Sequence, residues 1–382
     1  MNRKIQNLLW YLVPVVIVIT KWLRGGSAYN NYLVYKNVFW HSLHQKNLYL
    51  FYPADHFDQN LYGPIFAILI APFALLPDWL GMICWIIFGM WVLSKGLSYF
   101  FKQNPPTLLF LFVWIEALTS VHNLQFNILL AGGLLWAYAL VKQQNDWASS
   151  LIVMLLILTK IYGIVGLIFV FFSSSPRKFI IYSLGWCMLG LILPILLSSP
   201  IFVYQSYFHW YQAIVHKNEL NQNSFSGVGM QDISAMGLIK RIFGIPDLST
   251  LYFLIPAAIF SLLPLLRFKL HSNLDFQLKY FAQVMMGLVI FSSSSESSTY
   301  IIAICGFVIW QKDTFLQRPH LWLFIFAFIF TVLSPTDIFP PFIRKEFFVK
   351  YALKAFPILI AWIVISKQLI CNSFKTNELF ES

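Results

Sequence analysis

Long apolar runs separated by short polar or basic segments dominate the pattern of this chain. A helix that crosses a bilayer needs about 20 mostly apolar residues, or fewer where short or tilted neighbours thin the bilayer. By this criterion the pattern predicts an all-α polytopic membrane protein with about twelve transmembrane helices. The predicted spans cover residues 8–23, 61–76, 79–101, 106–119, 124–141, 147–172, 179–197, 251–266, 281–291, 300–310, 321–333 and 348–365.

Two longer polar stretches interrupt the apolar runs. Residues 24–62 separate the first two predicted spans, and within them residues 31–44 carry apolar and aromatic side chains at helical spacing. Such a segment is typical of a helix that lies in the membrane interface. Residues 198–249 are predicted to form a second long loop. Its aromatic residues at 204–211 are typical of the belt found at membrane–water boundaries, with carbohydrate stacking as the alternative.

Basic residues favour one side of the predicted membrane. If every predicted span crosses, the basic pairs at 3–4, 177–178 and 267–269 share a side. Basic residues in short loops favour the cytoplasm, so that side is predicted to be cytoplasmic. Both long polar stretches and residues 292–299 then share the opposite, extracytoplasmic side.

Composition supports lipid as the solvent for most of the chain. The sequence is 59% hydrophobic and only 11% charged, against about 25% charged residues in soluble domains. No hydrophilic block is long enough for a soluble domain, so we interpret residues 1–382 as a single integral membrane domain. The net charge of +11 suits anionic lipid headgroups. The basic residues are scattered, which argues against nucleic acid as a partner, and the four distant cysteines favour neither disulfides nor a metal site.

A group of titratable residues lies in the first long polar stretch. Asp55, His56 and Asp58 fall within residues 47–64, among aromatic side chains, in a chain with only 15 acidic residues. One interpretation is a catalytic carboxylate with a helper. The alternative is a polar loop whose carboxylates cap the helix that follows.

Polar residues near or within the apolar runs form a second group of candidates. Lys160 inside a predicted span costs about 2.5–3.5 kcal/mol to insert, so it should face the protein interior and pair with an anion. Glu116 is the candidate partner. Gln125 and Asn127, in the segment 122–127, could hydrogen-bond a sugar or headgroup, or simply cap a helix.

Three further residues complete the candidates. Lys240 and Arg241 could clamp a phosphate, with a solvated basic pair as the alternative. Glu296 could bind a polar ligand, with a serine-rich turn as the alternative.

The order of several short segments resembles the GT-C superfamily of membrane glycosyltransferases, most closely glycosyltransferase family 87. The resemblance covers roughly residues 1–215, which we interpret as the catalytic module, with residues 216–382 as variable C-terminal helices. The matching segments are Asn31-Tyr-Leu-Val-Tyr35, Asn47-Leu-Tyr49, the run from Tyr62-Gly-Pro to Pro72 with Leu76-Pro77, Leu124-Gln-Phe-Asn-Ile-Leu-Leu130 and Leu158-Thr-Lys-Ile-Tyr162.

The resemblance implies an inverting membrane hexosyltransferase, often a mannosyltransferase, with a polyprenyl-phosphate sugar as donor. It also implies a lipid-linked or surface-glycan acceptor on the extracytoplasmic side of a bacterial cytoplasmic membrane, with no cofactor and no obligatory metal. The matching segments place Asn31, Tyr35 and Tyr62 in the expected substrate site, together with Gln125 and Lys160.

One position departs from the family pattern. The family's first-loop aspartate precedes the aromatic residue of its segment, and this chain has Asn31 there. A neutral amide cannot act as a general base. Either Asp58, with Asp55 second and His56 assisting, has taken that role, or the enzyme is altered or inactive.

Two other classes of function stay open on the sequence. A transporter or flippase of lipid-linked glycans would use Lys160 and Glu116 to line its path. A catalytically silent membrane scaffold would explain Asn31.

Overall fold

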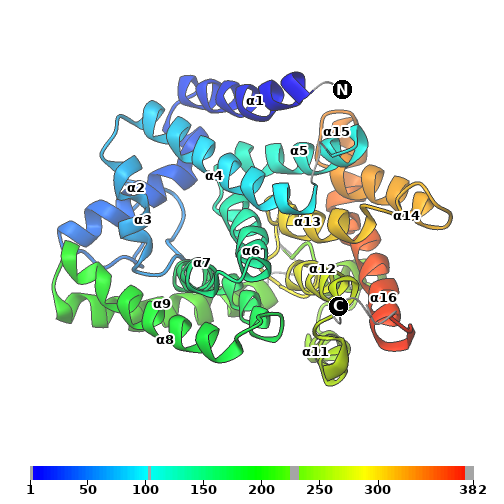
Figure 1. Cartoon of the computed structure of the whole chain (residues 1–382). Helices are drawn as coiled ribbons and strands as arrows, with labels where there is room; N and C mark the ends of the chain where they lie inside the picture. The colour runs from blue at the N-terminus through cyan, green and yellow to red at the C-terminus, as the bar shows by residue number, and fades with distance from the viewer. Residues whose placement is uncertain (1–2, 102–104, 224–231, 375–382) are drawn as a thin grey trace. The chain divides into compact units, whose positions relative to one another are not determined.

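Helices form every regular element in the part of the chain that the computed structural model describes, which is residues 3–101, 105–223 and 232–374 (Figure 1). The predicted all-helical class is therefore confirmed over these ranges. The chain divides into two compact units. Unit 1 comprises Met1–Asn104 and Ser120–Glu219, and unit 2 comprises Pro105–Thr119 and Leu220–Ser382.

Four helical segments in the described residues are long and apolar enough to cross a membrane. They are Lys4–Leu23, Asp78–Phe100, Pro176–Leu197 and Leu353–Cys371. Other apolar helices are shorter, at 10–17 residues. A helix rises about 1.5 Å per residue, so these shorter helices fall below the roughly 30 Å of a hydrocarbon core. The count of about twelve spans stays a prediction.

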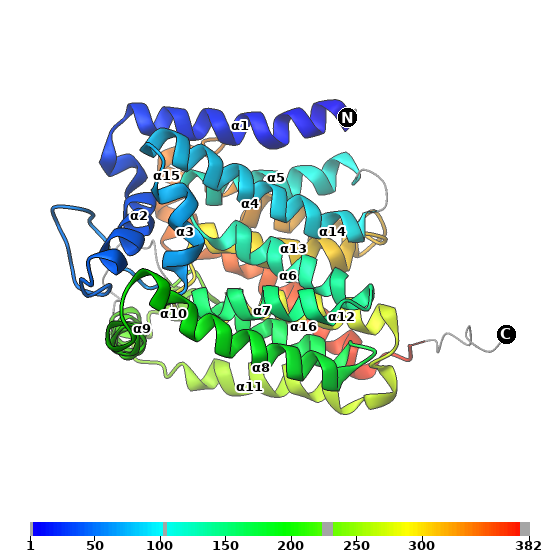
Figure 2. The same cartoon turned by 60° about the vertical axis from the view of Figure 1, so that its left-hand side comes forward.

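The helices of unit 1 form a bundle with cross-running elements at one end. In Figure 2, α1, α4, α6, α7 and α8 run across the page, while α2, the loop after it and α9 lie at their left-hand ends. The bounds are α1 Arg3–Leu23, α2 Asn30–Leu43, α3 Phe66–Ala74, α4 Asp78–Phe100, α6 Asn127–Lys142, α7 Asp146–Thr159, α8 Pro176–Ile192 and α9 Pro200–Asn223.

Close contact between α4 and α6 depends on two glycines. A Cβ atom on Gly96 would lie 2.6 Å from the carbonyl oxygen of Gly132, and one on Gly132 would lie 2.5 Å from the backbone nitrogen of Leu93. Small residues allow helix backbones in membranes to approach this closely. On the other side of α4, the indole of Trp10 in α1 donates a hydrogen bond of 3.0 Å to the carbonyl oxygen of Met90.

An aromatic cluster fills the end of unit 1 where α2, α3 and α4 meet. The Tyr35 ring lies edge-on to Tyr62 and Phe66, with centroids 5.0 and 5.1 Å away. Trp85 of α4 packs against Tyr35 at 5.8 Å, and Phe126 against Tyr62 at 5.8 Å. Edge-to-face pairs of this kind favour a fixed geometry, so the cluster holds Tyr35 and Tyr62 in place.

The structure corrects two predicted spans. Residues 61–76 contain only the nine-residue helix α3, Phe66–Ala74. Pro64 disfavours helix at the residue before it, and residues 60–65 form a loop instead. The run 147–172 is not one helix, because α7 ends at Thr159 and Ile161–Phe171 is a 3-10 segment. Lys160 stands between them in extended backbone, with φ −142° and ψ 121°.

The prediction of a long loop over residues 198–249 is also wrong. The 24-residue helix α9 covers Pro200–Asn223, and the short helix α10 covers Ala235–Phe243. Polar and aromatic residues alternate along α9, so it lacks the uninterrupted apolar run by which spans are recognised. The sequence also predicts that the polar segment 218–231 orients sugar and acceptor. Residues 218–223 belong to α9, and residues 224–231 lie outside the described residues.

Unit 2 contains the other helices. Its core includes α12 and α13, where a Cβ atom on Gly306 would lie 2.8 Å from the carbonyl oxygen of Ala282. The helices are the 107–119 part of α5 (Thr107–His122), α10, α11 Leu251–Leu262, α12 Leu274–Ile290, α13 Tyr300–Gln311, α14 His320–Ala327, α15 Pro341–Ile343 and α16 Phe356–Cys371.

A buried ion pair in unit 2 corrects the partner predicted for Glu116. The Nζ atom of Lys354 lies 2.8 Å from Oε1 of Glu116, and the two side chains are 4% and 0% exposed. Ser297 accepts a second hydrogen bond from Lys354 at 3.0 Å. The predicted pair of Glu116 with Lys160 is therefore wrong.

Candidate active site

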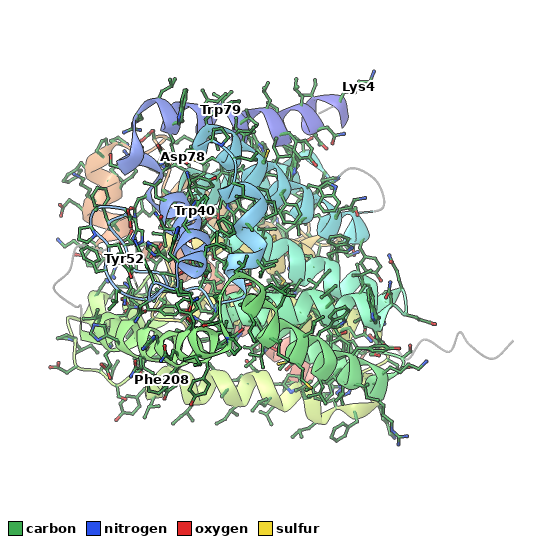
Figure 3. All side chains as sticks on the ribbon, turned by 90° about the vertical axis from the view of Figure 1, so that its left-hand side faces the viewer. Lys4, Trp40, Tyr52, Asp78, Trp79 and Phe208 are labelled. Carbon is green, nitrogen blue, oxygen red and sulfur yellow. The ribbon has the colours of Figure 1, made fainter. Side chains whose placement is uncertain are left out.

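The loop between α2 and α3 is held in shape by its own side chains. The hydroxyl of Tyr49 donates to the carbonyl oxygen of Tyr62 at 2.9 Å, and the hydroxyl of Tyr52 donates to that of Asn47 at 2.8 Å. Asn60 accepts a hydrogen bond from the backbone N–H of Tyr62 at 3.0 Å. Figure 3 shows Tyr52 at the end of unit 1 where this loop lies. A loop with this many internal bonds can present side chains at defined positions.

Asn30, in the first turn of α2, fixes the position of Asp58. Its amide nitrogen donates to Oδ2 of Asp58 at 2.8 Å, and its amide oxygen accepts from the backbone N–H of Phe57 at 2.7 Å. Asp58 itself is exposed. The carboxylate is thus held by a neutral amide on one side and open to solvent on another, an arrangement that leaves it able to accept a proton.

Asp55 and His56 belong to a different group of side chains. Oδ2 of Asp55 lies 3.3 Å from Nε2 of His41 in α2, and the His41 ring packs on Tyr52 with centroids 4.3 Å apart. His56 is buried, and its Nδ1 has no hydrogen-bond partner among the residues that the structure describes. Burial lowers the pKa of both His41 and His56, and the nearby carboxylates only partly oppose this. Both imidazoles therefore favour the neutral form.

Asn31 has a structural contact that an aspartate could not make. Its amide nitrogen donates a hydrogen bond of 2.7 Å to the carbonyl oxygen of Asn123, in the turn between α5 and α6. An ionised carboxylate only accepts hydrogen bonds, so it would face this oxygen with like partial charge. The amide at position 31 ties α2 to the turn that carries Gln125 and Asn127.

Lys160 lies at the break after α7 and points to that same turn. Its Nζ donates to Oδ1 of Asn127 at 2.8 Å, and the amide nitrogen of Asn127 donates to Oε1 of Gln125 at 2.5 Å. The ammonium also lies 5.0 Å from the centre of the Tyr162 ring and 5.9 Å from that of Tyr62. Such distances allow cation–π attraction.

Tyr35 and Tyr62 link the loop to the turn. Their hydroxyl oxygens are 2.9 Å apart, and the hydroxyl of Tyr35 also accepts a hydrogen bond of 3.2 Å from the backbone N–H of Phe126. The next residue, Gly63, donates its N–H to the carbonyl oxygen of Thr159 at 2.9 Å. A Cβ atom at Gly63 would lie 1.9 Å from the carbonyl oxygen of Leu158, so only glycine fits here.

Six of the predicted residues are therefore linked within unit 1. Asn31, Tyr35, Tyr62, Gln125, Asn127 and Lys160 are joined by hydrogen bonds, ring contacts and the turn 123–127. We call these six residues the polar cluster. Asp58 is joined to it through Asn30 and Asn31, which are neighbours in α2.

The other three predicted residues belong to unit 2 and have contacts there. Arg241 in α10 donates to the carbonyl oxygen of Val349 at 3.0 Å, and Lys240 beside it is buried. Glu296 precedes the 3-10 turn Ser297–Thr299 and forms a capping box with Thr299. The serine-rich turn given as the alternative for Glu296 is thus observed. A phosphate-binding role for the basic pair stays a prediction.

Two residues of the site, Asn30 and Trp210, were not given a role there from the sequence, and Asn123 was considered only within the segment 122–127. Asn30 holds Asp58, the carbonyl oxygen of Asn123 accepts the hydrogen bond from Asn31, and Trp210 of α9 donates its indole N–H to the carbonyl oxygen of Leu61 at 2.9 Å. The available signal for Asn30 was its place beside Asn31 at the start of a predicted helix, where asparagine often makes local contacts. No comparable signal in the sequence marks the partner of Trp210.

Comparison with known proteins identifies the family. The model of glycosyltransferase family 87 matches residues 60–293, which is more than half of the chain. The matched range includes Tyr62, Gln125, Asn127 and Lys160 of the polar cluster, and it begins after Asp58. No curated protein matches the chain. The match to the family model over most of the chain shows that this protein belongs to glycosyltransferase family 87.

Proposed function

We propose that this glycosyltransferase moves a hexose, with mannose as the first sugar to test, from a polyprenyl-phosphate donor to a lipid-linked or surface glycan. In this proposal the protein is a multi-pass protein of a bacterial cytoplasmic membrane, and transfer takes place on its extracytoplasmic side. One observation carries the proposal: the contacts through Asn30, Asn31 and Asn123 join the carboxylate of Asp58 to the turn that binds Lys160.

The reaction needs a base for the acceptor and a cation for the leaving group. In the proposed step, the acceptor hydroxyl oxygen forms a bond to the anomeric carbon while the bond from that carbon to the phosphate oxygen breaks. Asp58 takes the hydroxyl proton, and polyprenyl phosphate leaves with the bonding electron pair. Attack opposite the leaving group inverts the anomeric configuration.

Lys160 is proposed to stabilise the departing phosphate. Charge on the leaving phosphate grows as its bond to the sugar breaks, so a fixed ammonium lowers the energy of the transition state. Asn127 orients that ammonium through their 2.8 Å hydrogen bond. Gln125 and the hydroxyls of Tyr35 and Tyr62 are proposed to bind the sugar, whose hydroxyl groups need both donors and acceptors.

Asp58 is favoured over Asp55 as the base because of their different partners. Asp55 contacts the imidazole of His41, whose ring packs on Tyr52. Asp58 is instead bound by Asn30 at the start of α2, and the next residue, Asn31, reaches the turn 123–127. Asp55 is the second candidate, and His56 is proposed to support the loop. The contact of Asn31 with Asn123 also explains how an amide can occupy the family's aspartate position while the base lies elsewhere.

The test is a transfer assay with purified protein. Full-length protein is incubated with a lipid extract as acceptor and with radiolabelled polyprenyl-phosphate mannose as donor. A second reaction uses polyprenyl-phosphate glucose as donor. A new labelled lipid is expected from the wild-type chain. Asp58→Asn keeps the shape of the side chain and an acceptor for Asn30, and it should lower the rate by about 10²–10⁴-fold, the usual worth of a general base. Asp55→Asn makes the same change at the second candidate, and it should keep most of the wild-type rate if Asp58 is the base.

Two outcomes would contradict the proposal. Full activity of Asp58→Asn would remove the base assignment while leaving the donor class intact. No labelled product from any polyprenyl-phosphate hexose, with a folded protein, would remove the donor class itself.

A further inference from the structure

Helix α9 presents three different surfaces along its length. One side is buried in the protein and includes Phe202, Val203, Ser206 and Ala213. The remaining surface is exposed, but it is not uniform. It divides into an apolar strip and a polar strip, described next.

The apolar strip consists of Ile201, Tyr204, Phe208, Tyr211 and Val215. Tyr204 is 77% exposed, Phe208 56% and Tyr211 67%. Their spacing of three and four residues places them on one side of a helix. Figure 3 shows Phe208 projecting from α9 on the side away from Tyr52.

The polar strip runs beside the apolar one. Gln205, Gln212 and His216 are all exposed, and their separations of seven and four residues place them together on one side of the helix. The exposed half of α9 therefore changes from aromatic to amide and imidazole side chains around the helix axis. In water alone, separating apolar from polar side chains around the helix would not stabilise it. At a boundary between lipid and water the separation is stabilising, because each strip faces the solvent that suits it.

The orientation of α9 within unit 1 fits such a boundary. In Figure 2, α8 and its neighbours α7, α6, α4 and α1 run across the page, while α9 is seen nearly end-on at their left-hand ends. Three of these segments, Lys4–Leu23, Asp78–Phe100 and Pro176–Leu197, are long and apolar enough to cross a membrane. A helix that crosses the ends of such segments lies along the plane of the membrane surface.

The apolar strip continues an exposed apolar surface on the preceding segment. Leu184, Met188 and Ile192 of α8 are exposed, and Leu196, in the 3-10 segment Leu193–Leu197 that follows α8, is 78% exposed. Ile201, the first member of the strip, follows after only four residues and is 72% exposed. Large exposed apolar side chains in such number mark contact with lipid or another partner. Because it begins on a segment able to cross a membrane, lipid is the occupant that fits both parts.

We propose that α9 is an interfacial helix, with its apolar strip in the boundary between lipid headgroups and acyl chains and its polar strip in water. Tyrosine is enriched at this depth because its ring is apolar and its hydroxyl needs a polar partner. The occupant of the strip is therefore the bilayer surface itself. This proposal concerns where the protein meets lipid and does not depend on the proposed reaction.

Contacts on the buried side of α9 place the candidate site at the same membrane depth as α9. Trp210 donates to the carbonyl oxygen of Leu61, and its ring lies where a Cβ of Gly63 would be 2.9 Å away. Tyr62, between those two residues, belongs to the polar cluster. If α9 lies in the interface, the polar cluster lies next to the headgroup layer, where a lipid-linked phosphate would be found.

Spin-label depth measurements on the full chain in vesicles test this proposal. Cys84, Cys187, Cys305 and Cys371 are replaced by alanine, and single cysteines are introduced for labelling. The vesicles contain phosphatidylethanolamine and phosphatidylglycerol, and each label is exposed to oxygen, which partitions into lipid, and to a water-soluble nickel chelate. The labelled variants are Tyr204→Cys, Phe208→Cys and Tyr211→Cys for the apolar strip, Gln205→Cys and Gln212→Cys for the polar strip, and Leu184→Cys as a reference within α8.

The proposal predicts three different depths. Labels on the apolar strip should lie about 5–10 Å below the headgroup surface, the usual depth of an interfacial helix. Labels at Gln205 and Gln212 should be reached freely by the nickel chelate, and the label at Leu184 should lie deepest. Three positions on the strip are used, so the result does not depend on any one variant that fails to fold.

Three outcomes would overturn it. Free access of the nickel chelate to all five α9 labels would place the helix in water. A Phe208 label as deep as the Leu184 label would place α9 within the membrane core. Labels on the apolar strip that neither probe can reach would show that a protein surface, such as a second copy of this chain, covers the strip.

Discussion

Replacing Lys160 by methionine removes the cation proposed to stabilise the leaving phosphate. The side chain is half-buried, and its Nζ is 2.8 Å from Oδ1 of Asn127. Methionine is similar in length and unbranched, so it should fill the same space. Thermal unfolding of the variant will show whether loss of the hydrogen bond to Asn127 has a separate structural cost, which is about 1.5–3 kcal/mol for a bond that involves a charged group.

The size of the catalytic effect follows from charge and distance. A unit charge 4 Å from a second one contributes about 4 kcal/mol at an effective dielectric constant of 20. The proposed donor is a phosphodiester with one negative charge, and in the proposed step polyprenyl phosphate gains roughly one more as it leaves. If about half of that charge has formed in the transition state, Lys160 contributes about 2 kcal/mol to the step. Its loss should therefore lower kcat by about 30-fold.

The Lys160 assay separates charge from shape. Initial rates of sugar transfer are measured over a range of donor concentrations for wild type, Lys160→Met and Lys160→Arg. Lys160→Met should lower kcat and also raise KM, because attraction to the charge already on the donor is lost. Lys160→Arg keeps the charge and should lose less of kcat than Lys160→Met does.

Lys142→Met is the matched control. Lys142 ends α6, the helix that begins with Asn127, and it lies 15 residues further on, about 22 Å along the axis. The control should transfer sugar at the wild-type rate. A folded Lys160→Met protein whose kcat stays within about threefold of wild type would refute the assignment of Lys160, because even a weak contribution of 1.4 kcal/mol gives a factor of ten.

Further predictions concern an amide, an indole and a pH response. Asn31→Asp loses the hydrogen bond to the Asn123 carbonyl and sets a carboxylate against it, so the free energy of unfolding should fall by about 1–3 kcal/mol, measured by thermal unfolding. Trp210→Phe keeps a ring but loses the N–H that holds Leu61, and kcat/KM should fall about fivefold, the equivalent of about 1 kcal/mol. His56 is buried and its pKa is lowered, so the unfolded chain binds the proton more readily. Stability should therefore be fully present above the ordinary pKa of about 6.5 and be lost as the pH falls below it, as a lower melting temperature.

Each of these predictions has an outcome that contradicts it. Faster transfer by Asn31→Asp would show that the base belongs at position 31 and not at Asp58. Unchanged kinetics of Trp210→Phe would show that the bond to Leu61 does not position the site. For the pH response, His56→Gln is the control. If its melting temperature falls with acid as steeply as that of wild type, another group, such as His41, causes the loss.

The positions of most helices in unit 1 could be predicted from the chain alone. The apolar runs of α1, α4, α6 and α8 end within a few residues of their predicted bounds, because hydropathy is a local property that each segment carries with it. Prediction failed where a local pattern was ambiguous. The mixed sequence of α9 has no apolar run. The helix break at Lys160 has no proline beside it that would have indicated the end of α7.

Part of the candidate site could also be predicted, because local sequence shows which residue types are unusual in an apolar chain. Asp58 stood out because acidic residues are rare in this chain, and Lys160 because a cation in an apolar run is costly. Their partners could not be predicted. Asn30 is 28 residues from Asp58, and many amides along the chain are chemically equivalent candidates for that bond.

By itself, the sequence determined that this protein is helical and rich in apolar surface, which residue types are out of place in such a chain, and which family it resembles. Tertiary structure decided which of those residues meet. Lys160 is bound by Asn127 from 33 positions away, while Glu116 is paired with Lys354 from 238 positions away. The physical reason is that burial preference is a property of each residue, whereas the partner of a buried polar group is chosen by packing.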